Sequence, residues 1–442
     1  MTNTSTICRT PQNRLATMTS SLDLVTASRL PTAARESRPW ERWLARRLMA
    51  SLNDPNFRLE LWDGFRVEAS GASVGTFRIL QPSVLTRLCW QRSLAFGEAY
   101  SEGTLEVQGD LVEVLVELNR ALARSSPNWF GRLSDRWQRT RHRHSFAESK
   151  SSVYYHYDIG NEFYQQWLDE QLVYTCAYYS RPDLTLEEAQ VAKLDHVCRK
   201  LRLQPNETVV EPGCGWGALA LHMARQYGVR VRAFNISHEQ VAYARDRAKA
   251  EGLDNRVQFI EDDYRQIRGR FDAFVSVGML EHVGIGNFAE LGHLIDRSLK
   301  PNGRGLIHTI GKNVPAPMDA WSDKHIFPGA EPPSLSQMTE IFEAGRLSVL
   351  DVENLRLHYA KTLEEWHRRF EAAAENIEHQ FDTRFVRMWR LYLCASIAAF
   401  LSGDLQLFQV TFARAENNNV PWTRADLYRS GERGGVSPPV RG

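Results

Sequence analysis

The segment from Val209 to Gly217, which reads VVEPGCGWG, constrains the fold of this chain more than any other. An apolar run ends in an acidic residue, passes through alternating glycines and leads into a helix that opens at Gly217. Glycines lack the Cβ atoms that keep a ligand off the backbone, and the start of a helix presents unpaired N–H groups. A dinucleotide turn reads G-x-G-x-x-G, whereas the G-x-G-x-G spacing found here suits S-adenosylmethionine better.

The bulk composition narrows the class of protein. A chain of 442 residues with 43% hydrophobic content can bury a large core, and its length favours two domains. The formal net charge of +1 gives no overall attraction to nucleic acid, so we expect no nucleic-acid partner. The six cysteines form no C-x-x-C pair, which argues against a disulfide framework and a zinc site. We therefore expect a cytoplasmic protein without a bound metal.

Changes in composition divide the chain into five parts. Residues 1–39 are rich in Ser and Thr, lack the apolar segment of a secretory signal and are expected to be a disordered leader. Residues 40–128 resemble a small α+β domain, residues 129–150 a basic linker, residues 151–415 the main domain and residues 416–442 a flexible tail. No apolar run approaches the roughly 18 to 20 residues of a membrane-spanning helix; the longest, 391–401, is too short.

The linker and the small domain carry features of their own. Residues 132–144 interleave Arg and His with Trp, a composition suited to an anionic membrane surface and equally to a solvated connector. In the small domain we expect a helix over 43–49, a strand over 57–62 and a helix over 111–123.

After residue 151 the pattern alternates between strands and helices, as in a doubly wound α/β domain. The expected strands are 208–211, 229–234, 257–260, 271–277 and 303–310, followed by long helices over 363–400 and a late strand over 407–412. Ligands of such sheets bind beyond the carboxyl ends of the strands.

Two of these strand ends carry candidate cofactor contacts. Ser237 and Gln240 have the spacing of a helix-capping box, although Gln240 could equally reach a ribose hydroxyl. Asp263 supplies an acceptor for an adenine amino group, and the ring of Tyr264 a surface for the base.

The motifs taken together resemble those of the cyclopropane-fatty-acyl-phospholipid synthases and the related mycolic acid cyclopropane synthases. The resemblance extends from about residue 45 to residue 415. It depends on the following segments: YHYDIGN at 155–161, YTCAY at 174–178, GCGWG at 213–217, GMLEHVG at 278–284, HTIG at 308–311, IFPG at 326–329, and His358 with Tyr359.

The resemblance implies a Rossmann-like class I S-adenosylmethionine-dependent methyltransferase fold with a small N-terminal α+β domain. It implies methyl transfer to a cis double bond of a phospholipid acyl chain, followed by proton loss and ring closure. It also implies peripheral contact with the inner face of the cell membrane, aided by the small domain, and a possible homodimer. The residues that it places around the cofactor are Tyr174, Thr175, Gly213, Gly215, Ala218, Asn235, Ile236, Gln240 and Tyr264.

Members of this family also bind a bicarbonate ion beside the reacting carbons. The positions that match its contacts are Cys176, Glu281, His308, Ile310 and Tyr359, and Cys394 lies near a further assigned cysteine, within about two residues of Ser396. An ion is a suitable base because a side-chain carboxylate next to the carbocation could itself be alkylated. The His308 imidazole, the Tyr359 hydroxyl and nearby main-chain N–H groups would hold it, with Glu281 accepting its proton. His308 alone, within an apolar strand, would indicate a core histidine.

Several sequence features are compatible with two different interpretations. The rings of Tyr157, Phe163, Tyr174, Tyr178 and Tyr179 could face a carbocation or belong to the core. The insert 311–335, with five prolines, could be a flap over an acyl channel or a surface loop. The same methyl transfer without ring closure would give a methylene- or methyl-branched chain. A catalytically silent lipid-binding protein is disfavoured by the intact set of anion-holding residues.

Overall fold

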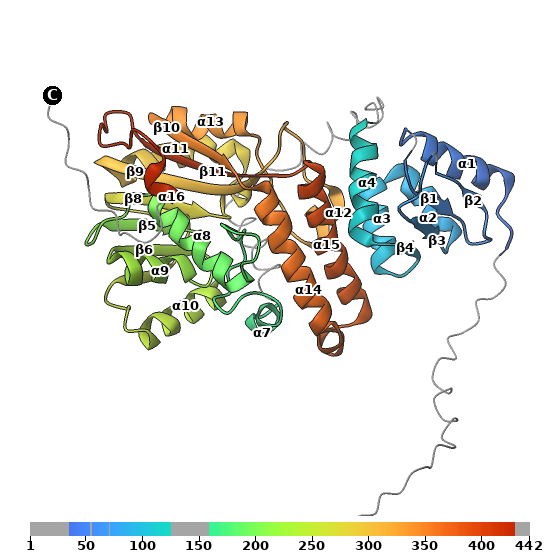
Figure 1. Ribbon diagram of the computed structural model, residues 1–442, viewed down its shortest axis with the longest axis horizontal. Helices are drawn as coiled ribbons and strands as arrows, with labels where there is room; N and C mark the ends of the chain where they lie inside the picture. Colours follow the sequence, from blue (N-terminus) through green and yellow to red (C-terminus); the bar gives the residue numbers. More distant parts are fainter. Residues whose placement is uncertain (1–34, 54, 70, 125–158, 429–442) are drawn as a thin grey trace, which may run out of the picture. The chain divides into compact units, whose positions relative to one another are not determined.

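The glycine-rich segment follows an inner strand of a seven-stranded sheet in the computed structural model, which describes residues 35–53, 55–69, 71–124 and 159–428 (Figure 1). Residues 37–442 form one contact unit. The strand order is β10-β11-β9-β8-β5-β6-β7. The strands are β5 (Thr208–Pro212), β6 (Arg230–Asn235), β7 (Val257–Glu261), β8 (Phe271–Val277), β9 (Leu299–Gly311), β10 (Leu347–Asn354) and β11 (Gln406–Arg414).

Strands β5 to β9 are parallel, and β11 and β10 join the sheet antiparallel beyond β9. The chain builds outward from β5 to β6 and β7 and then returns to place β8 on the other side of β5. This reversal is the point at which open α/β sheets bind ligands, beyond the carboxyl ends of the strands. The arrangement confirms the predicted class I methyltransferase fold.

Helices cover both faces of the sheet, because its strands are apolar on both sides. Helices α8 (Leu186–Lys200), α9 (Ala218–Tyr227) and α10 (His238–Ala250) share one buried cluster with the sheet. Helices α11 (Phe288–Ser298) and α13 (Leu335–Ala344) share the other. Short helices α7 (Asn161–Gln165), α12 (Ala320–His325) and α16 (Ala425–Tyr428), with the 3₁₀ turns η1 (Tyr264–Gln266), η2 (Leu280–His282) and η3 (Ile285–Asn287), complete this part.

A pair of long helices, α14 (Arg356–Gln380) and α15 (Thr383–Ser402), packs beside the sheet (Figure 1). Among the described residues, α15 is the single helix with the length and composition to cross a membrane, contrary to our expectation that no segment would reach that length. However, 56% of its most apolar window is buried inside the protein, as in the core helix of a soluble protein. Helices α3 (Arg92–Ser101) and α4 (Leu111–Arg124) of the small domain also pack against it.

The N-terminal part has a sheet of its own, in the order β2-β1-β3-β4. Its helices α3 and α4 join a core that is continuous with α14 and α15. The elements are α1 (Pro39–Ala50), β1 (Arg58–Glu60), β2 (Arg66–Val67), β3 (Thr76–Ile79), α2 (Pro82–Trp90), α3 (Arg92–Ser101), β4 (Leu105–Gln108) and α4 (Leu111–Arg124).

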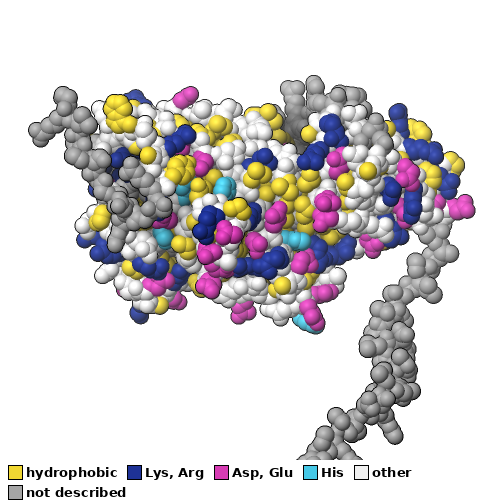
Figure 2. All heavy atoms as spheres, in the orientation of Figure 1, with side chains coloured by type: hydrophobic (Ala, Val, Ile, Leu, Met, Phe, Trp, Pro, Cys, Tyr) yellow, Lys and Arg dark blue, Asp and Glu magenta, His cyan; other side chains and the backbone are white. Residues whose placement is uncertain are grey.

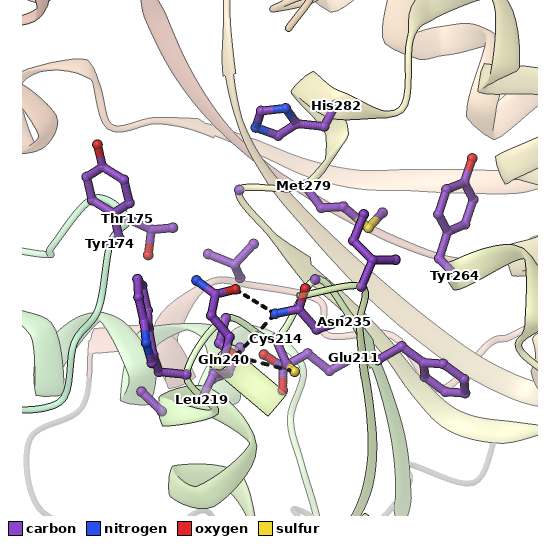
Figure 3. Close-up of a pocket in the computed structure, with 18 of the residues that line it drawn as sticks. Tyr174, Thr175, Glu211, Cys214, Leu219, Asn235, Gln240, Tyr264, Met279 and His282 are labelled. Atoms are coloured by element: carbon purple, nitrogen blue, oxygen red, sulfur yellow. Dashed lines mark hydrogen bonds between the residues drawn. The ribbon is translucent and has the colours of Figure 1, made fainter. Parts of the chain in front are cut away.

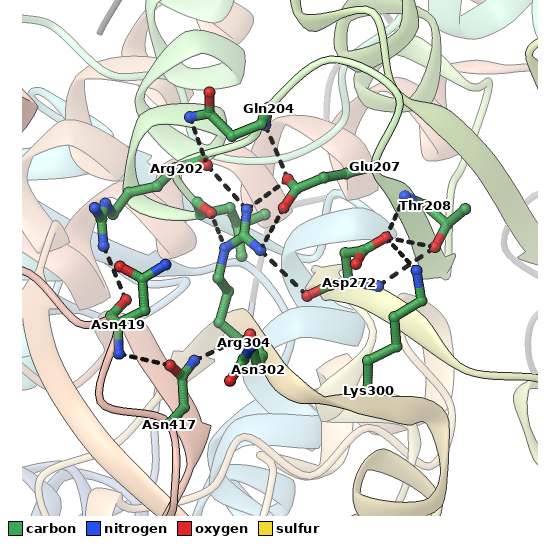
Figure 4. Close-up of polar contacts among 11 residues, drawn as sticks. Arg202, Gln204, Glu207, Thr208, Asp272, Lys300, Asn302, Arg304, Asn417 and Asn419 are labelled. Carbon is green, nitrogen blue, oxygen red and sulfur yellow. Dashed lines mark hydrogen bonds and ion pairs between the residues drawn. The ribbon is translucent and has the colours of Figure 1, made fainter. Parts of the chain in front are cut away.

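Polar side chains tie together the amino ends of the parallel strands (Figure 4). Arg304 of β9 donates to both carboxylate oxygens of Glu207, at 2.9 and 2.6 Å, and to the main-chain oxygen of Arg202 at 2.9 Å. Asp272, at the start of β8, accepts from the Thr208 main chain and from Lys300. These ion pairs therefore close the sheet at the amino-terminal ends of its parallel strands, and the carboxyl-terminal ends are left for a ligand.

Several sequence predictions concern residues that the structure does not describe. The leader up to residue 34, the basic segment 132–144, the ring of Tyr157 and the tail from residue 429 lie outside the described residues. Strand β10 and helices α2 and α3 were not predicted.

Candidate active site

The turn between β5 and α9 forms one wall of a pocket at the carboxyl edge of the sheet. Gly213 has a left-handed φ of +80°, and a Cβ atom there would lie 2.8 Å from Met279 Cβ. Gly213 and Gly215 line the pocket. Gly217, which we expected to contact the cofactor, is not among the lining residues. A Cβ atom there would lie 2.6 Å from the Phe259 ring, so packing of the turn against β7 requires this glycine.

Apart from Gly217, every residue that we assigned to the cofactor lines this pocket. Tyr174 and Thr175 lie on one side, Tyr264 on the opposite side, and Asn235 and Gln240 between them (Figure 3). That these residues contact the cofactor remains a prediction. The lining residues from the predicted set are Tyr174, Thr175, Gly213, Gly215, Ala218, Asn235, Ile236, Gln240, Asp263 and Tyr264.

The side chain of Gln240 faces the pocket and does not complete a capping box. Ser237 Oγ accepts from the main-chain N–H of Gln240 at 3.4 Å, which is the expected cap. The Gln240 side-chain oxygen instead accepts from Asn235 Nδ2 at 2.7 Å, and the same nitrogen donates to the main-chain oxygen of Gly215 at 3.3 Å. Asn235 and Gln240 thus fix each other at the end of β6, where a ribose would lie.

Tyr264 and Asp263 lie at the end of β7. The Tyr264 ring is largely buried, with the Arg265 guanidinium 5.2 Å from its centroid. Asp263 caps the η1 turn, because its Oδ1 accepts from the main-chain N–H of Arg265 at 2.9 Å. The capping bond fixes the carboxylate at the wall of the pocket.

Two buried charged residues at the pocket were not among our site predictions. Lys193 of α8 and Glu211 at the end of β5 both line it, and each is 2% exposed. Lys193 Nζ donates to Thr175 Oγ1 at 2.7 Å. Burial lowers the pKa of Lys193 to about 8 and raises the pKa of Glu211 to about 8. A lysine at a core position of α8 was the signal available in the sequence.

A second, larger cavity of about 1490 Å³ adjoins the pocket. It is lined by residues of the N-terminal part, the 311–335 insert and helices α14 and α15, and its lining is mainly apolar. One aromatic wall comes from Phe327 of the insert, and aromatic walls that we did not predict come from Tyr392 and Phe400. The two cavities share Tyr174, Thr175, Gly278 and His282. A ligand in the pocket and a hydrocarbon chain in the larger cavity would therefore meet at these four residues.

The insert forms a wall of the larger cavity and is not a detached surface loop. Trp321 of α12 is buried against α3, where a Cβ atom on Gly97 would lie 2.3 Å from its ring. Lys324 Nζ forms an ion pair with Glu98 Oε1 at 2.6 Å. The N-terminal part therefore holds this wall of the cavity in place.

Glu281, Ile310 and Tyr359, which we assigned to the anion, line the larger cavity. Glu281 Oε1 accepts from the main-chain N–H of Ile310 at 2.5 Å. Its Oε2 atom is buried without a hydrogen-bond partner among the described residues. Burial raises the pKa of Glu281 to about 7, although the Ile310 bond opposes this.

The side chains of His308 and Cys176 do not line either cavity. His308 is fully buried in β9, and its Nδ1 is 3.0 Å from Gln409 Nε2, which donates to it. The proton is then on Nε2, which has no partner among the described residues. Burial keeps the pKa of His308 well below its ordinary value. The Cys176 thiol donates to the main-chain oxygen of Ala177 at 3.1 Å, and burial raises its pKa, which disfavours the thiolate form that a nucleophile needs.

Cys394 is not brought to the site. Its sulfur lies 3.4 Å from His367 Nε2, and burial raises its pKa to about 12. Ser396, two residues later, lines the larger cavity instead. Two residues rotate a helix by about 200°, which places the two side chains on opposite faces of α15.

Of the described aromatic candidates, Tyr174 alone lines the cavities. Its hydroxyl is 2.8 Å from the Tyr392 hydroxyl. Phe163 packs edge-on against Trp389 in the core, with ring centroids 4.8 Å apart. Tyr178 stacks between His196 and His358. For Phe163 and Tyr178, and for Tyr179 beneath Lys361, the core interpretation holds.

Residues 144–410 match the sequence profile described as mycolic acid cyclopropane synthetase, and residues 44–126 match a domain of unknown function. A probable fatty acid methyltransferase of Pseudomonas putida is 37% identical over 396 residues, covering 86% of this chain and 98% of that protein. The cyclopropane-fatty-acyl-phospholipid synthase of Escherichia coli K12 is 37% identical over 368 residues, covering 82% and 94%.

A solved structure is similar over the catalytic part. The mycolic acid cyclopropane synthase CmaA1, complexed with SAH and CTAB, has a TM-score of 0.57 and 29% identity. The match covers 60% of this chain and 98% of that chain.

Proposed function

Because the chain belongs to the mycolic acid cyclopropane synthetase family and is an S-adenosylmethionine-dependent methyltransferase, we propose that it converts a cis double bond of a phospholipid acyl chain into a cyclopropane ring. The alkene's π electrons form a bond to the cofactor's methyl carbon as the carbon–sulfur bond breaks. A proton then leaves the new methyl group, and the ring closes with the electrons of that C–H bond.

The observation that carries this proposal is the junction of the two cavities. Both cavities have mainly apolar linings. The pocket at the glycine-rich turn adds the polar side chains of Asn235, Gln240 and Asp263, which suit a nucleoside, and the larger cavity has apolar and aromatic walls for a hydrocarbon. They share Tyr174, Thr175, Gly278 and His282, so a sulfonium and an alkene can be held together there. Apolar and aromatic walls also keep water from the carbocation.

We also propose that a bicarbonate ion takes up the proton. Two buried polar atoms on adjacent strand ends, His308 Nε2 and Glu281 Oε2, lack partners among the described residues. The first is a donor and the second an acceptor, the pair of groups that an HO–CO₂⁻ ion would satisfy. The ion supplies a base that is not part of the protein chain. Tyr359, which lines the larger cavity together with Glu281, carries a further hydroxyl group on its wall.

The protein is proposed to work on the cytoplasmic face of the cell membrane as a peripheral protein. Trp43 and Trp90 of the N-terminal part are 57% and 88% exposed, and Trp90 also lines the larger cavity. Basic and apolar side chains gather over the part labelled α1 and β2 in Figure 1 (Figure 2). Tryptophan and arginine together favour the boundary between lipid headgroups and acyl chains. The substrate's tail would enter the cavity from that side.

The test is incubation of the purified protein with vesicles of an oleoyl phospholipid, S-adenosylmethionine and bicarbonate. Mass spectrometry should find lipid that has gained one CH₂, and proton NMR should find the upfield methylene signals of a ring. Removing bicarbonate should slow product formation, and adding it back should restore the rate. Cofactor turnover without any lipid product would contradict the proposal.

A second product is favoured by one relative. The Pseudomonas putida protein is named as a fatty acid methyltransferase, a name that does not include ring closure. A methylene- or methyl-branched chain would give the cofactor's carbon in the lipid without upfield ring signals, so the same NMR spectrum separates the two products.

A further inference from the structure

The cofactor pocket contains a buried lysine to which the proposed function assigns no role. Lys193 comes from α8 and lines the pocket, with its Nζ 2.7 Å from Thr175 Oγ1. Thr175 lies on the side of the pocket opposite Tyr264, the proposed adenine neighbour (Figure 3). An S-adenosylmethionine molecule with its base near Tyr264 would place its amino-acid end near Tyr174 and Thr175 (Figure 3), and therefore near the Lys193 ammonium group that is bonded to Thr175. That end of the cofactor carries a carboxylate.

The surroundings of Lys193 leave its ammonium group with donors to spare. Its hydrogen-bond acceptor among the described residues is Thr175 Oγ1, at 2.7 Å, whereas an ammonium has three N–H donors. A buried cation is costly unless it is paired; the carboxyls of Asp169 and Glu211 are near enough to attract Lys193, but neither forms an ion pair with it in the described part of the chain. The carboxylate of Glu211 lines the same pocket, and its Oε2 lacks a partner there.

The bond to Thr175 also decides where the threonine hydroxyl points. Because Lys193 Nζ donates to Thr175 Oγ1, the proton of that hydroxyl is directed elsewhere. Thr175 lines both cavities, at their junction. We propose that Lys193 is a positioning residue for the cofactor's carboxylate, which it attracts with its charge and to which it directs the Thr175 hydroxyl. This inference rests on the proposed function, since it requires that the pocket binds S-adenosylmethionine.

A purely structural role for Lys193 is the competing explanation. The segment around Thr175 is already held by an uncharged residue one turn earlier on α8. Gln190 Nε2 donates to the main-chain oxygens of Val173, at 3.2 Å, and Thr175, at 2.9 Å. Holding this segment in place therefore does not require a charged residue. If Lys193 only held the segment, its loss would weaken ligands with and without a carboxylate equally; if it attracts the carboxylate, its loss would weaken only the ligand that has one.

The experiment measures binding of two ligands to the full-length protein by calorimetry: S-adenosylhomocysteine, and its decarboxylated analogue, which keeps the amine. We expect the wild type to prefer the first ligand on the order of tenfold, as for one charge-assisted hydrogen bond. Lys193→Met should reduce this preference to within about threefold. An unchanged preference in Lys193→Met would overturn the inference. If that variant does not fold, Thr175→Val, which removes the hydroxyl without removing volume, decides by the same criterion.

Two matched controls on α8 separate charge from structure. Gln190→Met loosens the same segment without removing a charge, so it should weaken both ligands equally and keep the wild-type preference. Lys200→Met removes a different buried lysine, whose Nζ lies 2.6 Å from Glu353 Oε2. Neither residue of that ion pair lines the pocket, so both affinities should stay unchanged. Loss of the preference in either control would also overturn the inference. A wild-type protein that binds neither ligand would instead contradict the proposed function.

Discussion

Replacing Glu281 by glutamine should make the protein more stable at alkaline pH and much slower in catalysis. Burial raises the pKa of this carboxyl from its ordinary value of 4.5 to about 7 in the folded protein. The folded chain therefore holds a proton that the unfolded chain has lost between these two values. The stabilisation from this proton is fully present below pH 4.5 and is lost as the pH rises through about 7.

The size of this effect follows from the two pKa values. One pKa step corresponds to about 1.4 kcal/mol, so between pH 5 and pH 8 the wild type should lose about 2.5 kcal/mol from this group. Glutamine does not ionise, so the Glu281→Gln variant should not show the loss. Its unfolding free energy should rise relative to the wild type by about 2.5 kcal/mol over that range, or about 3 °C in midpoint temperature for a chain of this length.

The assay is scanning calorimetry of both proteins at pH 5, 6.5 and 8, without cofactor or bicarbonate. The difference at pH 5 is the internal reference, because it contains the packing effects of the substitution and little of the charge. A difference between the two proteins that stays constant from pH 5 to pH 8 would refute the reasoning, since it would mean that Glu281 ionises in the folded protein as it does in water.

Further predictions concern activity, the acyl cavity and the framework. The kcat/KM of the wild type should fall as the pH drops below about 7, where Glu281 becomes protonated, and Glu281→Gln should be at least about 100-fold slower, as measured by methyl transfer to vesicles. Ala399→Trp, which fills the larger cavity alone, should reduce lipid methylation at least about tenfold and leave the calorimetric affinity for S-adenosylhomocysteine within about twofold. Gly97→Val should displace Trp321, destabilise the protein by about 1 to 3 kcal/mol in urea unfolding and slow turnover. Arg304→Met should cost about 2 to 4 kcal/mol in the same measurement and leave kcat unchanged, because its bonds lie at the far edge of the sheet.

The main sheet could be predicted from the sequence because its strands are short apolar runs. Strand β8 lies over 271–277 as predicted, and β5, β6, β7, β9 and β11 overlap their predicted ranges. Strand β10 gave no such signal: Val349, Leu350 and Val352 are partly exposed, and the strand pairs at the edge of the sheet with β11 only. Its position depends on an antiparallel partner more than 50 residues away, which local patterns do not encode.

Site residues could be predicted from the sequence where they directly follow a strand in a recognisable motif. They could be predicted less well where they lie on a long helix, because the rotation of the helix decides which side chains face the cavity. Gly213, Gly215 and Asn235 follow strands directly, so their position at the pocket follows from the strand order. Cys394 depended on the rotation of a long helix, in which an error of two residues exchanges the buried face for the cavity face. Lys193 was visible as a charge among core positions, but its partner Thr175 is known only from the packing of α8.

The most direct test of the central claim is a crystal structure of this protein with S-adenosylhomocysteine and a long-chain amphiphile. We predict that the nucleoside lies between Asn235 and Tyr264, and that continuous hydrocarbon density runs past Leu363 and Phe400 and ends beside the cofactor's sulfur at Thr175 and Gly278. A filled cofactor pocket beside a larger cavity that holds only ordered water, with the amphiphile bound elsewhere, would contradict it.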